Sequence, residues 1–233
     1  GNITTYWGDG IVDAMVAIEN AEHETYPMTT IEGEYEATNV PMGYEYKIEP
    51  TKDTNPINGL STLGLFMTQK YILGYAPKEI NTPYQIIAMD ANCSGTLTTY
   101  DLFVMQQILI GNISEFPDCQ SWVFVNADYE FPEEFNDKNV FPYENSHTMM
   151  LDKEDVVADF IGIKVGDVLG RALASDNVQA ESADSRNRKV MPLQLSQRTI
   201  QKGEEVAITF SAKDAASAVS FQLGLDYDPS TLE

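Results

Sequence analysis

Basic residues and long apolar runs are both scarce in this sequence of 233 residues. It carries 14 Lys and Arg against 36 Asp and Glu, and its formal net charge of −22 repels phosphate groups. Nucleic acid and anionic membrane surfaces are therefore poor candidate partners. No run of about eighteen or more apolar residues occurs, so we expect no membrane insertion. A basic start followed by an apolar block is also missing, so we expect a mature product or a fragment without a signal peptide.

The patterns that carry catalysis are missing as well. The two histidines, His23 and His147, lie far apart, and neither has a zinc-ligand spacing or a neighbouring nucleophile. Carboxylates are so numerous that no glycosidase pair stands out, and no glycine-rich phosphate loop leads into a helix. We therefore expect a protein that is not an enzyme.

Alternation of apolar and polar residues predicts β-structure on both sides of a helical middle part. In residues 1–50 it predicts an antiparallel sandwich of about five strands. The runs that carry this pattern there are 13–20, 33–40 and 44–50. Beyond the helical part, strand-like runs occur at 121–125, 159–168, 205–212 and 218–233, and residues 128–147 form a long connection. Residues 171–189 are small, polar and charged, which is typical of a linker.

The middle part, residues 53–111, repeats itself with a constant offset of 37 residues, from Asp53 to Asp90. Identical residues recur at this offset without a gap. They are the pairs Asn55 and Asn92, Leu60 and Leu97, Thr62 and Thr99, Leu65 and Leu102, Phe66 and Phe103, Gln69 and Gln106, and Gly74 and Gly111. Each half therefore begins with a polar loop and continues into a helix that ends at a glycine. Such a register indicates an internal duplication.

The second loop, residues 90–101 with the sequence DANCSGTLTTYD, has the spacing of a calcium loop. Calcium takes six to eight oxygens, which a twelve-residue loop supplies from positions 1, 3, 5, 7, 9 and 12, with a glycine at position 6. Gly95 holds position 6 here. The expected ligands are Asp90, Asn92, Ser94, the Thr96 carbonyl, Thr98 through water, and Asp101. The alternative is a surface turn of small polar residues.

The first loop, residues 53–64 with the sequence DTNPINGLSTLG, matches this pattern less well. Asp53, Asn55 and Ser61 hold positions 1, 3 and 9. Position 5 is Ile57, and position 12 is Gly64, which has no carboxylate. We therefore expect one Ca²⁺ ion in the second loop, and a second ion in the first loop remains an open alternative.

The two cysteines, Cys93 and Cys119, lie on either side of the second helix. A helix of about a dozen residues rises about 18 Å, so the chain must double back after it for the cysteines to meet. Residues 112–118 contain the proline and aspartate for that return. We predict a disulfide, which in a loop of this length stabilises the fold by about 3 to 4 kcal/mol. The alternative is two small buried thiols; a disulfide favours a location outside the cell.

These motifs resemble the dockerin family, whose unit is a duplicated loop and helix without a helix entering the loop. No clear helix is expected before Asp90. The order of motifs along the chain is similar to dockerin-bearing surface proteins of Bacteroidetes-type bacteria, in which a late element usually reads Gly-Asp-Val-Asn-Gly. Here that element is GDVLG at residues 166–170, so the resemblance implies only a weak ligand role for Asp167.

The resemblance also implies a surface that binds a protein partner, a cohesin-like domain. The helix positions that it assigns to this surface are Thr62, Leu63, Gln69, Lys70, Thr99, Tyr100, Gln106 and Gln107. Leu63 and Tyr100 are the more telling anchors if they are exposed. The spaced apolar residues Leu102, Met105 and Leu109 are expected to form the core face of an amphipathic helix.

Both ends of the chain resemble sandwich domains of surface proteins. Residues 1–50 are similar to carboxypeptidase-regulatory-like or prealbumin-like modules, and residues 190–233 are similar to the opening strands of a cohesin-like sandwich. The latter segment is too short to stand alone, so we expect it to pair with strands of another copy or of missing residues. Head-to-tail strand pairing of this kind would build rings or filaments.

We therefore expect a multi-domain, mainly β protein with a small α dockerin-like unit. The expected parts are a sandwich at 1–50, the duplicated unit at 51–119, a β extension at 120–170, a linker at 171–189 and an incomplete sandwich at 190–233. The favoured function is a calcium-stabilised scaffold or adhesive module at the bacterial cell surface. The alternative is a non-catalytic appendage of a larger secreted hydrolase.

Overall fold

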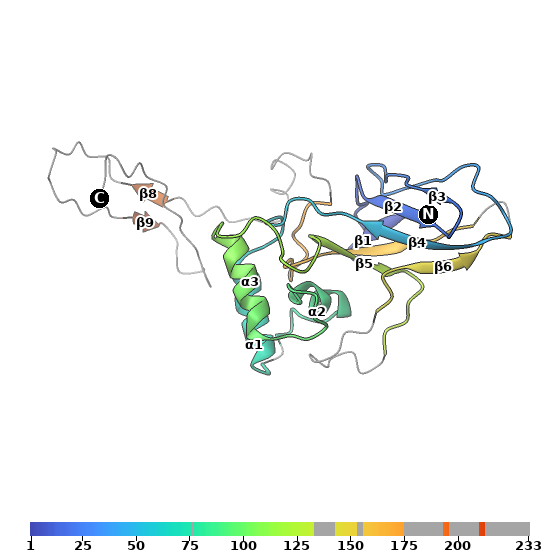
Figure 1. Cartoon of the computed structure of the whole chain (residues 1–233). Helices are drawn as coiled ribbons and strands as arrows, with labels where there is room; N and C mark the ends of the chain where they lie inside the picture. Colours follow the sequence, from blue (N-terminus) through green and yellow to red (C-terminus); the bar gives the residue numbers. More distant parts are fainter. Residues whose placement is uncertain (76, 133–142, 153–155, 175–192, 196–209, 213–233) are drawn as a thin grey trace.

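The computed structural model describes residues 1–75, 77–132, 143–152, 156–174, 193–195 and 210–212 (Figure 1). Within these ranges the chain is mainly β, as the alternation predicts, with nine strands and three short helices. The strands are β1 (Ile3–Thr5), β2 (Met15–Glu19), β3 (Glu24–Thr25), β4 (Glu45–Thr51), β5 (Trp122–Asn126), β6 (His147–Met150), β7 (Phe160–Lys164), β8 (Leu193–Leu195) and β9 (Phe210–Ala212). The helices are α1 (Thr62–Ile72), α2 (Pro83–Met89) and α3 (Thr99–Leu109).

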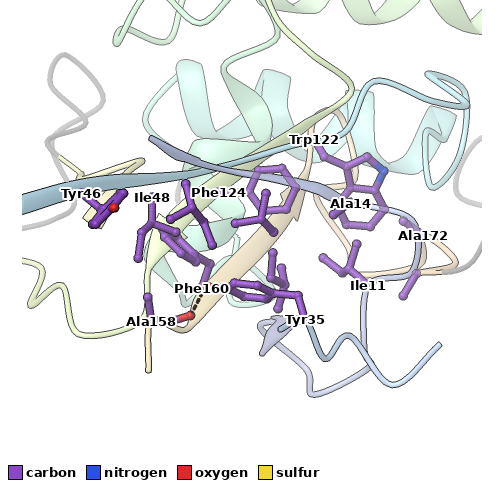
Figure 2. Close-up of a cluster of buried hydrophobic side chains, with 14 residues drawn as sticks. Ile11, Ala14, Tyr35, Tyr46, Ile48, Trp122, Phe124, Ala158, Phe160 and Ala172 are labelled. Carbon is purple, nitrogen blue, oxygen red and sulfur yellow. Dashed lines mark hydrogen bonds between the residues drawn. The ribbon is translucent and has the colours of Figure 1, made fainter. Parts of the chain in front are cut away.

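Two sheets enclose the largest apolar core. One has the strand order β1-β7-β5, with β1 parallel to β7, and the other has the order β3-β2-β4-β6 with antiparallel pairs. Figure 2 shows the side chains between them, with Phe124 of β5 near Ile48 of β4 and Phe160 of β7, Tyr46 of β4 at one end of the cluster and Trp122 of β5 beside Ala14 at the other. All six are at most 6% exposed, so this buried cluster joins the two sheets.

Strands β5 and β7 are buried on both faces. Trp122 and Phe124 point into the core between the sheets, whereas Val125 of β5 and Ile163 of β7 pack against α2 on the other face. Strands covered on both sides read as continuous apolar runs, which explains the sequence of both strands. Figure 1 shows the helices on this side of the sheet.

Residues 1–50 do not form a sandwich by themselves, contrary to the domain division expected from the sequence. β1 pairs with β7, and β4 pairs with β6, so both sheets draw strands from either side of the helical part. The run 33–40 is not a strand; only an isolated bridge joins Asn2 to Glu34. β6 begins at His147, the last residue of the segment 128–147 that the sequence predicts to be a connection, and the sequence predicted no strand at 147–150. Alternation shows that a segment is half-buried, but it does not show which strand is its partner.

The duplication is visible as two matching helices. α1 and α3 have 11 residues each, and both ends keep the offset of 37 residues. Each helix follows an N-cap hydroxyl residue, Ser61 or Thr98, and each is followed by a glycine with positive φ, Gly74 or Gly111. The two helices contact each other. Of the predicted apolar stripe on the second helix, Met105 is buried and the half-buried Leu102 packs against the same core cluster, whereas Leu109 does not; Val104 and Ile108 complete the buried face.

The C-terminal part is described at two short stretches only. Strands β8 and β9 pair antiparallel with each other. The remainder of the expected incomplete sandwich and all of the expected linker after residue 174 lie outside the described residues.

Candidate metal site

The second loop is held between two helices. α2 ends at Met89 and Asp90 is its C-cap, so a helix does enter this loop, contrary to our sequence interpretation. The signals for α2 are local: Thr82 is the N-cap, Pro83 is the first helical residue, and Gln85 completes a capping box. These three residues could have located α2 from the sequence alone. At the other end of the loop, Thr98 and Asp101 form the capping box that starts α3.

Side-chain polar atoms converge at the centre of the second loop. One terminal atom of the Asn92 amide lies 2.9 Å from Asp90 Oδ1, 3.0 Å from Ser94 Oγ and 2.8 Å from Asp101 Oδ1. Ser94 Oγ in turn lies 3.1 Å from the carbonyl oxygen of Thr96. These residues at positions 1, 3, 5, 7 and 12 are the ones that the calcium spacing predicts as ligands. The structure thus brings together the predicted ligands, apart from Thr98.

The Asn92 amide has two useful orientations in this cluster. With Nδ2 toward Asp90, Ser94 and Asp101, it donates to all three oxygens and satisfies the loop without a metal. With Oδ1 at that position, it accepts from the backbone N–H of Ser94 at 3.3 Å and adds an oxygen to the cluster. The second orientation is the one that a hard cation would select, because calcium is bound by oxygen atoms.

Burial makes the two carboxylates of the second loop electrostatically costly. Asp90 is 7% exposed and Asp101 is fully buried. Burial raises the pKa of Asp90 to about 6, and the charge of Asp101 adds to the rise. The backbone N–H groups of Gly95 and Ser94, which donate to Asp90 at 2.7 Å and 3.0 Å, act in the opposite direction. A cation between the carboxylates would relieve this cost.

Thr98 has a different role from the one expected. Its hydroxyl accepts from the backbone N–H of Tyr100 at 3.2 Å and donates to Asp101 Oδ2 at 3.1 Å. The backbone N–H of Thr98 also donates to the same Asp101 oxygen at 2.8 Å. Asp101 therefore offers one oxygen to the helix cap and the other to the loop centre.

Only two of the converging residues are acidic. Within the described ranges, no group of three or more His, Cys, Asp or Glu side chains is placed to hold a metal ion. A cation in the second loop would thus depend on amide, hydroxyl and carbonyl oxygens in addition to two carboxylates. Ligand charge is one of the factors that set calcium affinity, so we expect weak binding, in the range of about 10⁻⁴ to 10⁻³ M that is typical of extracellular modules.

The predicted disulfide joins Cys93 to Cys119 with a Cα–Cα distance of 5.5 Å. It ties the second loop to the segment that leads into β5, and Cys119 Sγ lies 3.8 Å from the carbonyl oxygen of Asp90. Cys93 has a positive φ of 50°, a backbone conformation that the loop requires at this point. The crosslink therefore ties the second loop to a residue that follows the repeated stretch 53–111.

The first loop has no comparable cluster of ligands. Asp53 Oδ1 accepts from the backbone N–H and the hydroxyl of Ser121, at 2.8 Å and 2.9 Å. Ser61 Oγ accepts from the backbone N–H of Gly64 as the N-cap of α1. Asn55 is exposed and Ile57 is 51% exposed. The three ligands expected from the sequence are thus occupied elsewhere or turned to solvent.

Asp167 is buried, and its carboxylate holds the turn that follows it. Its two oxygens accept from the backbone N–H groups of Arg171 at 2.9 Å and Ala172 at 2.7 Å. Burial raises its pKa, while these hydrogen bonds and the charge of Lys164 oppose the rise. Asp167 lies against the first loop rather than the second, so it is not placed to complete the cluster around Asp90.

The expected partner surface is only partly exposed. Thr99, Tyr100, Gln106 and Gln69 are exposed, whereas Thr62, Leu63, Lys70 and Gln107 are half-buried. Tyr100 is 47% exposed and stacks with Phe103, which is 52% exposed, at 6.0 Å between ring centroids. The sequence interpretation missed Phe103, although it stands three positions after Tyr100 and so on the same helix face. In the first half, Lys70 covers the ring of Phe66, at 4.8 Å.

Comparison with family models, with curated proteins and with solved structures found no match to this chain. No helix among the described residues is long and apolar enough to span a membrane.

Proposed function

We propose that this chain is a non-enzymatic extracellular module that is stabilised by calcium and acts by holding another protein. The convergence of Asp90, Asn92, Ser94 and Asp101 at the start of α3 carries the proposal. These are the residue types and spacing that a hard cation uses, and two buried carboxylates have a reason to bind one. The disulfide supports a location in an oxidising compartment.

Calcium uptake is tested by calorimetric titration of the chelator-treated chain. We expect one ion to bind, and we expect Asp101→Asn to abolish the binding because it removes the charge while keeping the shape. Asp128→Asn is the matched control, since this exposed aspartate lies outside both loops. Absence of uptake by the parent chain, or uptake that is equal in both variants, would contradict the proposal.

The exposed aromatic pair on α3 supports the second part of the proposal. Tyr100 and Phe103 present two adjacent rings to solvent directly after the second loop. Exposed aromatic residues are over-represented among the anchors of protein interfaces. We propose a cohesin-like domain as the partner, because the motifs of this chain resemble dockerins.

Binding of a purified cohesin-like domain to the immobilised full chain tests this surface. We expect Tyr100→Ala and Phe103→Ala to weaken binding at least about tenfold each, which corresponds to about 1.4 kcal/mol. Tyr75→Ala is the control, because Tyr75 is 70% exposed and lies after α1. Equal affinities for all three variants would place the partner surface elsewhere.

A further inference from the structure

A lysine from a distant strand reaches into the first loop. Lys164 is the last residue of β7 and is 1% exposed. Its Nζ donates to the carbonyl oxygen of Pro56, inside the first loop, at 3.0 Å and to the carbonyl oxygen of Val165 at 3.1 Å. The Phe116 ring lies 5.1 Å from the same nitrogen. A buried ammonium group is costly unless acceptors and negative charge surround it, so these contacts are specific.

The turn that follows Lys164 fills the first loop from the same side. The Asp167 side chain packs directly against Gly59, which stands at position 7 of this loop: a Cβ atom on Gly59 would lie 2.6 Å from Asp167 Cγ. Gly59 also has a positive φ of 76°. Only glycine combines this backbone conformation with so close an approach. The charge of Lys164 lowers the pKa of Asp167 against the effect of burial, so the two groups interact.

The space that a carboxylate at position 12 would need is also bordered by this turn. Gly64 is buried, and a Cβ atom on it would lie 3.8 Å from both the carbonyl oxygen of Gly166 and the Cβ of Val168. In the second loop the same position holds Asp101, which contributes one oxygen to the cluster around Asn92. The two loops therefore differ in the charge of the group that is buried in each. The second has two buried carboxylates, and the first has a buried ammonium group supplied by β7.

We propose that the ammonium group of Lys164 is the resident cation of the first loop and orders it by binding the carbonyl oxygen of Pro56, at position 4 of the loop. The residues of the first loop do not fit calcium, because Asp53 is bonded to Ser121 and position 12 has no carboxylate. The first loop is then ordered with or without calcium. The assignment of the single calcium ion to the second loop rests on the proposed function. The ordering of the first loop by Lys164 does not depend on that function.

Hydrogen exchange of the full chain, measured by mass spectrometry, reads the two loops separately. In chelator we expect the amides of residues 53–61 to be protected, and calcium to leave their exchange unchanged. Calcium is expected to slow exchange only in residues 90–98. Gain of protection at 53–61 on calcium addition to the parent chain would overturn the assignment of Lys164. A second loop that does not respond would instead contradict the proposed calcium function and leave the result at 53–61 valid.

Substitution of the lysine provides the direct test. Lys164→Met keeps the apolar stem and removes the charge, and we expect exchange at 53–61 to become at least about tenfold faster in chelator and in calcium alike. Lys47→Met is the control, because the Lys47 side chain is 46% exposed and lies on β4. Unchanged exchange at 53–61 in Lys164→Met would overturn the proposal. Should this variant not fold, the parent chain decides: exchange at 53–61 that is protected in chelator and unchanged by calcium supports the proposal, and unprotected amides there in chelator overturn it.

Discussion

Replacing Asp101 by asparagine separates the two roles of this side chain, which are capping of α3 and binding of a cation. Asp101 Oδ2 accepts from the backbone N–H of Thr98 at 2.8 Å, while Oδ1 lies 2.8 Å from the Asn92 amide. An asparagine side chain can keep the first contact with its oxygen and donate to the oxygen of Asn92 with its nitrogen. We therefore expect the chelated variant to be within about 1 kcal/mol of the parent chain in its free energy of unfolding.

The same substitution is expected to remove the stabilisation by calcium. At a calcium concentration of about 100 times Kd, binding to the folded state alone stabilises by about 2.7 kcal/mol. For chains of this size, each kcal/mol corresponds to a rise in Tm of about 2 to 4 °C. The parent chain should thus gain about 5 to 10 °C on calcium addition, and Asp101→Asn should gain almost nothing.

Scanning calorimetry with and without chelator measures both quantities. Asp101→Ala distinguishes the two roles further, because it loses the cap as well and should cost about 1 to 3 kcal/mol even in chelator. The reasoning is refuted if the parent chain has the same Tm in both conditions. It is also refuted if Asp101→Asn keeps the full shift.

Three other perturbations have defined outcomes. In chelator, a raised pKa of about 6 for Asp90 means that the folded chain binds its proton more tightly than the unfolded chain, so stability should fall by about 2 kcal/mol as the pH rises from about 4 to 7. Urea unfolding should show this fall in the parent chain and not in Asp90→Asn. Reduction of the Cys93–Cys119 disulfide should lower the free energy of unfolding by about 3 to 4 kcal/mol. It should also weaken calcium binding, measured by titration. An unchanged calcium affinity after reduction would mean that the crosslink does not restrain the second loop. Removal of residues 190–233 should convert an assembly to a monomer in analytical ultracentrifugation, because the described part of this segment is a pair of short strands, and isolated pairs are marginal; a full chain that is already monomeric would contradict strand pairing between copies.

Several elements were predictable because their signals lie within a few residues. The alternation around Met15–Glu19 and Glu45–Thr51 predicted β2 and β4, and the apolar runs predicted β5 and β7. The repeated polar loops and the terminal glycines located α1 and α3 at their observed offset. The run 33–40 alternates equally well but forms no strand, since alternation reports burial of one face and not pairing.

The calcium-type spacing predicted which residues the second loop brings together, apart from Thr98; their role as ligands stays a prediction. Those residues lie within twelve positions, so the turn at Gly95 and the start of α3 are enough to make them converge. The partner of Cys93 was also predictable, because there is only one other cysteine. The role of Thr98 was not, since a hydroxyl before a helix can serve a metal or a cap, and only the hydrogen bonds decide.

The sequence by itself determined the local features: the duplicated loops and helices, the ligand spacing of the second loop and the mainly β character of the rest. The sequence already shows that the first loop lacks a carboxylate at position 12, but only the tertiary structure shows that Lys164 enters this loop. Lys164 reaches Pro56 across 108 positions of the chain. Strand β1 likewise meets β7, whose first residue, Phe160, pairs with Ile3. Contacts of this range depend on how the sheets pack, because burial of an ammonium group or a strand edge is only favourable once its distant partners are in place.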